Sequence, residues 1–503
     1  MTTNELYKRY KDYYKKFKGY RILFSILEYD NSTIAPIKSL DEKSEYTNFI
    51  FEDYMKLKKS NDYINLINEL DSKKDRLNPQ FKRIAYLAKK ELDQEEKVPL
   101  SKQVELNKLT AKAFLTWNEA KAKNDYNIFA PSLEKIINLV KEITLLRGET
   151  DGNIYNTLLD DYEEGITTTE LDSFFNALKS KIIPLLKRIK ESNVVINDSF
   201  AHAKVSKAKQ LKFSKYILKL NGYDYTRGAL GEAEHPFTSE ISPNDIRVTT
   251  HIYENLFFSN IFSTAHEGGH AIYNQNLGKN LICNLKESAS MAMDESQSRF
   301  YENIIARSPE YIDLISKKVN SLLPKEYKNK VTNKEMYLAA NKVEASLIRT
   351  EADELTYTLH IIIRYELEKG LFCGTLEVKD LKKEWNRLYK EYLGVDVTND
   401  SEGILQDIHW SCGSFGYFPS YALGNAYGAQ ILHTMKQEIN VGQAIKDNKI
   451  KQVIGSYLKK NLYQYGKLYS PKELIIKLTG EPLNPQYFID YLTNKYEEIY
   501  FNK

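Results

Sequence analysis

The stretch FSTAHEGGHAIYNQN, Phe262 to Asn276, places two histidines four residues apart, with a glutamate directly after the first. In a helix, residues i and i+4 project about 40° apart on one face, so His266 and His270 can offer both imidazoles to a single ion. Glu267 projects about 100° further round, beside the ion without binding it. This HExxH pattern predicts a metal-binding helix.

A Zn²⁺ ion held by three protein ligands keeps a water in its open position, and a carboxylate beside that water can take its proton. Glu267 is therefore the predicted general base. Downstream, ESASMAMDESQSRFYENII reads as another helix, and Glu295 follows His270 after 24 intervening residues, enough for a turn and a returning helix. We expect a His, His, Glu site, with Glu287 and Asp294 as rival ligands. Zinc is the expected ion, and cobalt and manganese are the alternatives.

Two glycines, Gly268 and Gly269, lie in the middle of this predicted helix. Each lowers helix stability by about 1 kcal/mol relative to alanine. Their physical use is to remove side chains where another backbone comes close. We expect a neighbouring helix, or the strand predicted within Asn244 to Tyr253, to make that approach.

The composition argues for one large, mainly helical body over residues 1–503 and against a nucleic-acid partner. Lys+Arg (71) and Asp+Glu (68) nearly cancel to a formal charge of +3, and the charges are interspersed along helical segments. The 22 glycines and 13 prolines form no spacer that would separate domains. The 37 tyrosines stand at helical spacings, which favours core packing over base stacking.

Cysteine usage predicts a reducing compartment. Cys283, Cys373 and Cys412 share no CxxC spacing, so free thiols are expected. The mostly apolar run Ile22 to Leu27 is six residues long, too short for a signal core or a membrane span. We expect a cytoplasmic protein without a membrane partner.

Helical periodicity dominates the chain, as in PSLEKIINLVKEITLLRG, Pro131 to Gly148. Gly148 and Gly152 fit a helix stop and turn, and Thr167 to Thr169 fit a helix start. Period-two alternation in NDIRVTTHIY predicts a strand, and NVVIND (193–198) is a weaker candidate. The periodicity is also broken at 394–407 and 413–421, where polar and aromatic residues indicate more than a connector.

Several motifs, taken in order, carry a family resemblance: HPF (235–237), DIRVTT (245–250), HEGGH (266–270), ESQSR (295–299), IRTEADEL (348–355), and GILQDIHW followed by GSFGYFPSYALGN. Together they resemble the carboxypeptidase Taq family of metallocarboxypeptidases. The resemblance is strongest from His235 to about Asn425. The N-terminal half agrees less specifically.

The resemblance implies a two-lobed α-helical clam with a deep active-site groove, and we expect a small β-sheet beside the metal helix. It implies one catalytic metal ion, removal of single C-terminal residues with broad side-chain tolerance, and a homodimer. Within one domain, residues 1–220 would form the groove wall or lid and residues 221–503 the catalytic part. Two positions depart from the family pattern: Asp294 stands where a histidine is usual, and His251 where an arginine is usual.

A carboxypeptidase must recognise a terminal carboxylate, and a guanidinium fork suits it best. Arg349 is the candidate, and the resemblance supports it. Its alternative is a salt bridge to Asp353 on the same helix, which contributes little if exposed. Glu351 and Asp353 could equally orient a ligating imidazole.

An oxyanion that forms during hydrolysis needs a hydrogen-bond donor besides the metal. His409, Tyr417 and Tyr421 lie in or beside a glycine-punctuated loop, and His409 with Tyr421 is the expected catalytic pair. A structural tyrosine-rich loop is the alternative. For His235 the family motif implies substrate contact, with a structural hydrogen bond as the alternative.

The leading hypothesis is a metallocarboxypeptidase acting on peptides with a free C-terminus. An oligoendopeptidase of similar architecture would gain nothing from a carboxylate clamp at Arg349. A non-catalytic helical peptide clamp would hold a structural metal, but structural zinc usually has four protein ligands and no adjacent general base. A zinc-dependent hydrolase of non-peptide substrates also stays open.

Overall fold

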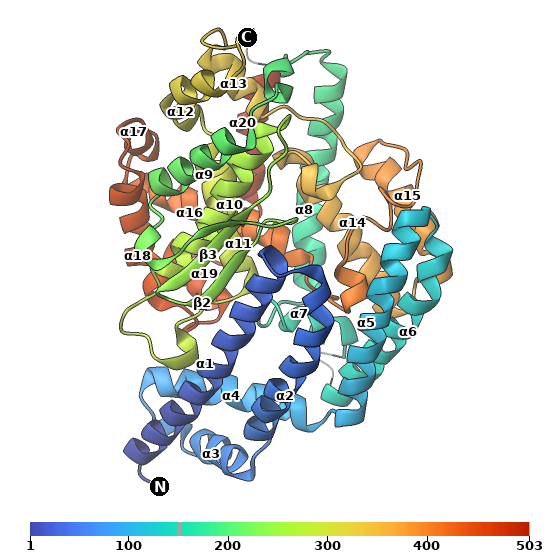
Figure 1. Cartoon of the computed structure of the whole chain (residues 1–503), viewed down its shortest axis with the longest axis vertical. Helices are drawn as coiled ribbons and strands as arrows, with labels where there is room; N and C mark the ends of the chain where they lie inside the picture. The colour runs from blue at the N-terminus through green and yellow to red at the C-terminus, as the bar shows by residue number, and fades with distance from the viewer. Residues whose placement is uncertain (149–151, 502–503) are drawn as a thin grey trace.

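A mainly helical chain surrounds one small sheet, as the periodicity predicts (Figure 1). The computed structural model describes residues 1–148 and 152–501. The helices before the sheet are α1 (Thr3–Thr33), α2 (Leu40–Lys58), α3 (Asn61–Ser72), α4 (Pro79–Glu96), α5 (Leu100–Lys123), α6 (Tyr126–Arg147), α7 (Ile154–Asp160), α8 (Thr168–Glu191) and α9 (Lys207–Asn221).

The helices after the sheet include the two that carry the predicted metal ligands, α10 and α11. They are α10 (Phe257–Gln275), α11 (Met291–Arg299), α12 (Pro309–Leu322), α13 (Asn333–Ala340), α14 (Glu354–Cys373), α15 (Leu381–Leu388), α16 (Pro419–Glu438), α17 (Val441–Lys446), α18 (Ser456–Asn461), α19 (Pro471–Thr479) and α20 (Gln486–Tyr500). A π-helical segment, η6 (Phe300–Ala306), continues α11 directly.

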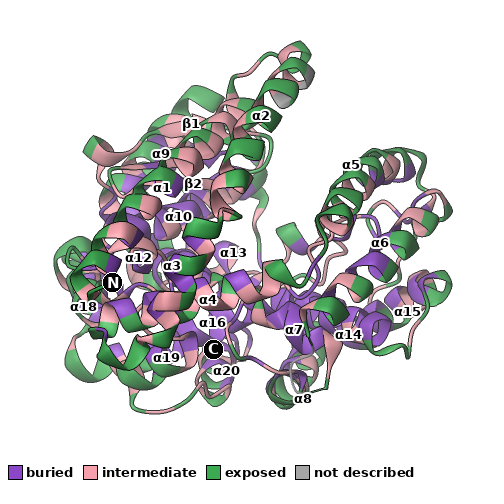
Figure 2. Cartoon of the chain, turned by 90° about the horizontal axis from the view of Figure 1, so that it is seen from below, coloured by how far each residue is buried: buried purple, intermediate pink, exposed green. Residues whose placement is uncertain are grey.

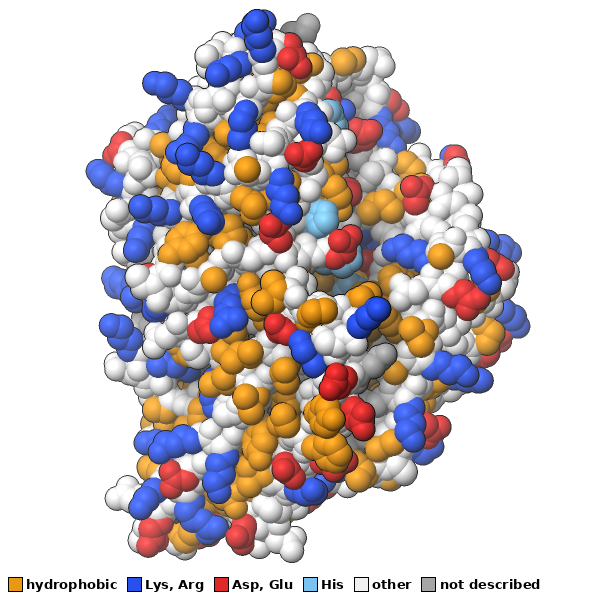
Figure 3. Space-filling view, in the orientation of Figure 1, with side chains coloured by type: hydrophobic (Ala, Val, Ile, Leu, Met, Phe, Trp, Pro, Cys, Tyr) orange, Lys and Arg blue, Asp and Glu red, His pale blue; other side chains and the backbone are white. Residues whose placement is uncertain are grey.

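The helices form two lobes (Figure 2). One lobe holds α1–α4, the sheet, α9–α13 and most of the C-terminal helices. The other is built from α5–α7 packed with α14 and α15. Each lobe therefore draws on both the N-terminal and the C-terminal parts of the chain. In the space-filling view, histidine side chains gather in the hollow between the two sides (Figure 3).

The sheet has three strands, β1 (Leu230–Glu232), β2 (Thr238–Ser242) and β3 (Asp245–Thr250), in the order β1-β3-β2. The central strand β3 confirms the predicted strand, and its Ile246 and Val248 are buried. The chain leaves the sheet after Thr250. The sequence missed β1 and β2, which are too short to show alternation. NVVIND is not a strand but an irregular segment after α8.

The predicted helix ends agree with the structure. Thr167 caps α8, and Glu170 completes a capping box with it. Gly148 follows α6 with φ +98°, a conformation that favours glycine. The first predicted break, 394–407, is irregular, and the second, 413–421, is irregular only as far as residue 418, because α16 begins at Pro419. A short 3₁₀ turn, η10 (His409–Cys412), lies between them. We call residues 408–418, which contain this turn and end where α16 begins, the histidine loop.

Candidate metal centre

The structure brings three predicted ligands together, and we call them the metal group: His266 and His270 on α10 and Glu295 on α11. Glu295 Oε2 lies 3.6 Å from His266 Nε2 and 3.5 Å from His270 Nε2. Both imidazoles are about one-sixth exposed, whereas the glutamate is buried. The solvent-exposed side of the metal group is therefore the side formed by the two histidines.

Close packing of α10 against α11 sets this geometry. A Cβ on Gly269 would lie 2.5 Å from the Gln297 carbonyl oxygen and 2.7 Å from Ser298 Cα, both backbone atoms of α11. The predicted close approach at Gly269 is thus confirmed, and its source is the neighbouring helix. Gly268 instead faces the end of the Leu218 side chain, at 2.8 Å, so the prediction of a nearby backbone is wrong there.

Two carboxylates contact the outer nitrogens of the histidines. Glu302 Oε2 lies 2.8 Å from His266 Nδ1, and Asp294 Oδ2 lies 2.7 Å from His270 Nδ1. Such contacts keep the proton on Nδ1 and turn each Nε2 toward a shared ion. Asp294 therefore orients a histidine, and it is not a rival ligand as the sequence allowed.

Three other carboxylates that the sequence suggested as metal ligands or as partners of a ligating imidazole have different contacts in the structure. Glu287 pairs with Arg21 at 2.9 Å, so it is not a rival ligand. Glu351 is exposed, and Asp353 caps α14, so neither orients an imidazole. The sequence missed Glu302, although it lies seven residues after Glu295, two helical turns along the same face.

A largely buried arginine, Arg299, contacts both carboxylates on the acidic side of the metal group. Arg299 Nε donates to Glu295 Oε1 at 2.6 Å, and its Nη1 donates to Glu302 Oε2 at 3.0 Å. Burial opposes ionisation of both carboxyls, but Arg299 and His266 outweigh it. The pKa of Glu295 is held well below its usual range, and that of Glu302 falls to about 2. Both carboxylates are therefore ionised at neutral pH.

The metal group fits a divalent ion. Ligand atoms about 2.0–2.2 Å from a tetrahedral zinc ion lie roughly 3.4 Å apart. The two distances from Glu295 Oε2 to the imidazole nitrogens are close to this value. The donor set is one that zinc, cobalt and manganese accept. Both Nε2 atoms face the same oxygen of the Glu295 carboxylate, Oε2.

Glu267 lies beside the metal group, as its place in the helix predicts. The residue is only 7% exposed. Its Oε2 accepts a hydrogen bond from Thr238 Oγ1 at 2.7 Å, and the same hydroxyl lies 3.0 Å from the Glu267 carbonyl oxygen. Strand β2 therefore fixes the rotamer of this carboxylate.

Arg349 lies in a 3₁₀ turn, η7 (Arg349–Glu351), ahead of α14. Arg349 Nε donates to Asp407 Oδ1 at 3.0 Å, and Arg349 Nη2 lies 2.9 Å from the same oxygen. Arg349 Nη1 donates to Tyr357 Oη at 3.0 Å. The expected alternative, a salt bridge from Arg349 to Asp353, is therefore wrong. Asp407 also pairs with Arg364 at 2.6 Å. One carboxylate thus faces two guanidinium groups.

Tyr357, which the sequence analysis missed, connects this arginine to the metal group. Its hydroxyl accepts from Arg349, and Arg299 Cζ lies 4.1 Å from the centroid of its ring. Arg349 Cζ also lies 5.1 Å from the ring centroid of Tyr421. No local sequence pattern marks Tyr357, because its partners come from η7 and α11.

Two predicted residues of the histidine loop, His409 and Tyr417, meet the predicted Tyr421 in the first turn of α16. His409 Nε2 lies 3.4 Å from Tyr421 Oη, and the rings of Tyr417 and Tyr421 meet edge to face with centroids 5.1 Å apart. Burial lowers the pKa of His409 to about 4, so its imidazole is neutral at neutral pH. The three side chains form one cluster beside Arg349.

The two remaining histidines that the sequence motifs singled out, His235 and His251, lie outside this cluster. His235 is exposed in the segment between β1 and β2. His251, one of the departures from the family pattern, follows β3, and its Nδ1 lies 3.1 Å from the Ala233 carbonyl oxygen. Its ring lies against that of Tyr253, with centroids 4.4 Å apart.

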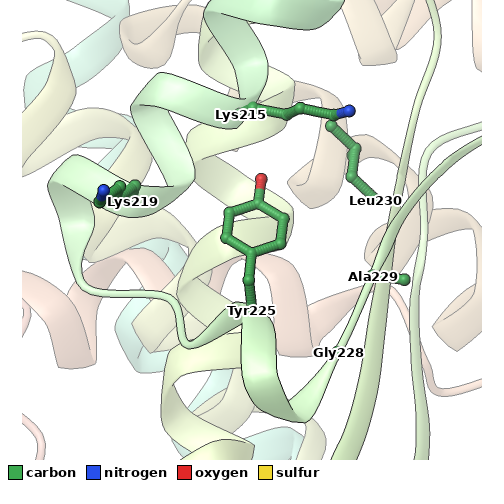
Figure 4. Close-up of a pocket in the computed structure, with 6 residues that line it drawn as sticks. All are labelled: Lys215, Lys219, Tyr225, Gly228, Ala229 and Leu230. Atoms are coloured by element: carbon green, nitrogen blue, oxygen red, sulfur yellow. The ribbon is translucent and has the colours of Figure 1, made fainter.

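A separate hollow of about 470 Å³ lies along α9 and β1 (Figure 4). It is lined by Lys215, Lys219, Tyr225, Gly228, Ala229 and Leu230. None of these residues belongs to the metal group.

Among the described residues, no helix combines the length and the apolar character needed to cross a bilayer. All three cysteines are free.

Two imidazoles and a carboxylate around a shared point, with a further carboxylate in a HExxH helix, are the arrangement of a metallopeptidase. Comparison with known proteins gives the family. The family model described as carboxypeptidase Taq (M32) metallopeptidase matches residues 9–496. The chain belongs to this family, and it is a metallocarboxypeptidase.

Individual relatives agree over most of the chain. Carboxypeptidase 1 of Bacillus subtilis (strain 168) is 39% identical over 494 residues, 98% of each chain. Thermostable carboxypeptidase 1 of Pyrococcus furiosus is 37% identical over 400 residues, 78% of this chain and 79% of the relative. The crystal structure of an M32 carboxypeptidase from Deinococcus radiodurans R1 superposes with a TM-score of 0.94 at 28% identity, covering 99% of each chain.

Proposed function

We propose that the protein removes single C-terminal residues from peptides with broad side-chain tolerance, and that Glu267 is its general base. The observation that carries this proposal is the single cluster formed by the metal group, Glu267 and the Arg349 guanidinium. Tyr357 connects the arginine to Arg299 beside the metal group.

His266, His270 and Glu295 would hold one divalent ion, with zinc as the proposed metal and cobalt or manganese as alternatives. Bound there, the ion would polarise the scissile carbonyl and make a water more acidic. The roles of Glu302 and Asp294 are to hold the two imidazoles in the ligating tautomer.

Proton transfer is assigned to Glu267. Its carboxylate takes a proton from the attacking water and passes it to the departing amine. The hydrogen bond from Thr238 occupies only part of Oε2 and leaves Oε1 for this proton. The developing oxyanion is stabilised by the N–H of neutral His409 and the hydroxyl of Tyr421.

The terminal carboxylate of the substrate is assigned to Arg349. Of its five N–H bonds, the contacts to Asp407 and Tyr357 use three, which leaves one on each terminal nitrogen for a substrate. Arg349 and Arg364 together share the single negative charge of Asp407, so one positive charge remains uncompensated. Tyr417 and His235 are proposed to contact the peptide further along.

One pair of peptides tests this proposal. An N-blocked peptide with a free C-terminal carboxylate and its amidated version are incubated with the metal-loaded protein, with and without chelator, and products are followed by mass spectrometry. We expect chelator-sensitive loss of single residues from the free acid alone. Internal cuts in both peptides would instead establish an endopeptidase, and no cleavage with zinc, cobalt or manganese would favour a non-catalytic peptide clamp.

Two further parts of the proposal concern the protein in the cell. A homodimer is proposed from the family resemblance, and sedimentation of the purified protein tests it. A cytoplasmic location is proposed because all three cysteines are free, as in a reducing compartment. Fractionation of the source cells tests the location.

A further inference from the structure

The histidine loop is attached to the protein core through one buried carboxylate. Glu368 lies on α14, and it is 0% exposed. Its Oε1 accepts a hydrogen bond from Trp410 Nε1 at 2.7 Å, and its Oε2 accepts one from the Gly416 backbone N–H at 2.8 Å. The two donors lie near opposite ends of the loop, on either side of the bend that follows His409.

A third donor and close backbone packing attach the same loop to α7. The Tyr155 hydroxyl donates to Glu368 Oε2 at 2.7 Å. Gly416 has φ +85°, and a Cβ there would lie 2.8 Å from the Leu158 carbonyl oxygen of α7. Phe415 packs edge to face against Phe372 of α14, with ring centroids 4.9 Å apart. Glu368 therefore collects donors from the loop and from α7 at one point.

The donors around Glu368 match its ionised form. A carboxylate accepts three hydrogen bonds readily, whereas a protonated carboxyl must donate its own hydrogen. Among the described residues, Glu368 forms no ion pair. Arg364, one turn earlier on α14, is a cation whose charge acts on Glu368, and it is paired with Asp407. Tyr155 and Tyr162 are the titratable groups that face it from outside α14.

Burial raises the pKa of Glu368 to about 7, and the three donors oppose that rise. The carboxyl therefore changes protonation close to neutral pH. On protonation the carboxyl carries a hydrogen of its own, which among its three partners only the Tyr155 hydroxyl can accept, and the uncharged group accepts the Trp410 and Gly416 N–H bonds more weakly.

We propose that Glu368 is a positioning residue for the peptidase reaction: its carboxylate holds the histidine loop in the conformation that presents His409 and Tyr417 to the substrate. The catalytic consequence rests on the proposed function, whereas the attachment of the loop does not. Glu368 touches neither the metal group nor the expected substrate position, and it acts only through the loop.

The test compares Glu368→Gln with Glu366→Gln, a control on the same helix whose partners, Lys179 and Tyr392, lie outside the loop. Hydrogen exchange by mass spectrometry reports on loop peptides without requiring activity. We expect loop amides of Glu368→Gln to exchange at least about tenfold faster than those of the wild type, because the amide replaces one acceptor by a donor. Peptides from α10 and α11 should be unchanged in both variants.

Kinetics then separate a positioning role from general damage. We expect kcat of Glu368→Gln on the free-acid peptide to fall about 10- to 100-fold, since a loop displacement of about 1 Å is enough for that loss. KM and metal affinity should stay within about threefold of the wild type, and Glu366→Gln should match the wild type throughout. Wild-type loop exchange in Glu368→Gln would overturn the proposal, and so would a fast loop with unchanged kcat.

A pH series provides a second criterion. After correction for intrinsic exchange, loop protection in the wild type should fall between pH 8 and pH 6 toward that of Glu368→Gln, which should stay constant. If Glu368→Gln does not fold, Trp410→Phe removes one donor and leaves the carboxylate, and unchanged loop exchange in it would overturn the attachment. A wild type without peptidase activity would reject the proposed function, while the exchange data still decide the attachment.

Discussion

The glycine that separates α10 from α11 offers a direct test of how the metal group is built. In Gly269→Ala the new Cβ would lie 2.5 Å from the Gln297 carbonyl oxygen, whereas ordinary contacts begin near 3.4 Å. The two helices must therefore separate by up to about 0.9 Å. Helix propensity gains about 1 kcal/mol from alanine, and overpacking costs about 1–3 kcal/mol. The net free energy of unfolding should fall by roughly 0–2 kcal/mol.

The larger effect should be on the metal. Glu295 lies on the displaced helix, and ligand distances tolerate only about 0.2 Å. We expect metal affinity to fall at least about tenfold. Competition with a chelating dye measures the affinity, and denaturant unfolding of the metal-free protein measures stability.

Gly268→Ala is the matched control, since its Cβ meets only the end of the Leu218 side chain. It receives the same gain in helix propensity, about 1 kcal/mol, and should keep wild-type metal affinity. If Gly269→Ala binds metal as tightly as Gly268→Ala and is at least as stable, then contact between the two helix backbones does not set the ligand geometry.

Three further outcomes are expected. Glu302→Gln should lower metal affinity about 10- to 100-fold by releasing the His266 imidazole, as a dye competition would show. Glu267→Gln should lower kcat about 10²- to 10⁴-fold while metal affinity stays constant, measured on one preparation. Global unfolding hydrates Glu368 and returns its pKa from about 7 to 4.5, so the native state as a whole is favoured by protonation, and this contribution is complete below about pH 4.5 and lost as pH rises through 7. Release of the histidine loop alone has the opposite pH dependence, because it leaves the carboxyl buried and removes only the donors that lower its pKa. Denaturant unfolding should therefore show the wild type losing roughly 3 kcal/mol relative to Glu368→Gln between pH 4 and 8.

The parts of the site that lie within one helix could be predicted from the sequence. The four-residue spacing of His266 and His270 places both imidazoles on one face in any α-helix, and Glu267 follows from the same geometry. The capping box at Thr167 and the glycine at 148 are likewise local signals, and both correspond to observed helix ends.

The contacts between elements were decided by tertiary packing. Arg349 pairs with Asp407, 58 residues further along, and not with Asp353 four residues away, because η7 and α14 are separate elements. Tyr357 and Glu368 carry no distinguishing pattern, since their neighbours are brought to them by other helices.

The amino-acid sequence by itself thus determined the helical class, the metal-binding helix and the family, because these depend on spacings of a few residues and on ordered motifs. Only the tertiary structure decided which carboxylates orient the imidazoles, what occupies Arg349, and how the histidine loop is held. Those choices depend on the packing of α7, α11 and α14, and a hydrogen bond between distant segments leaves no local periodicity.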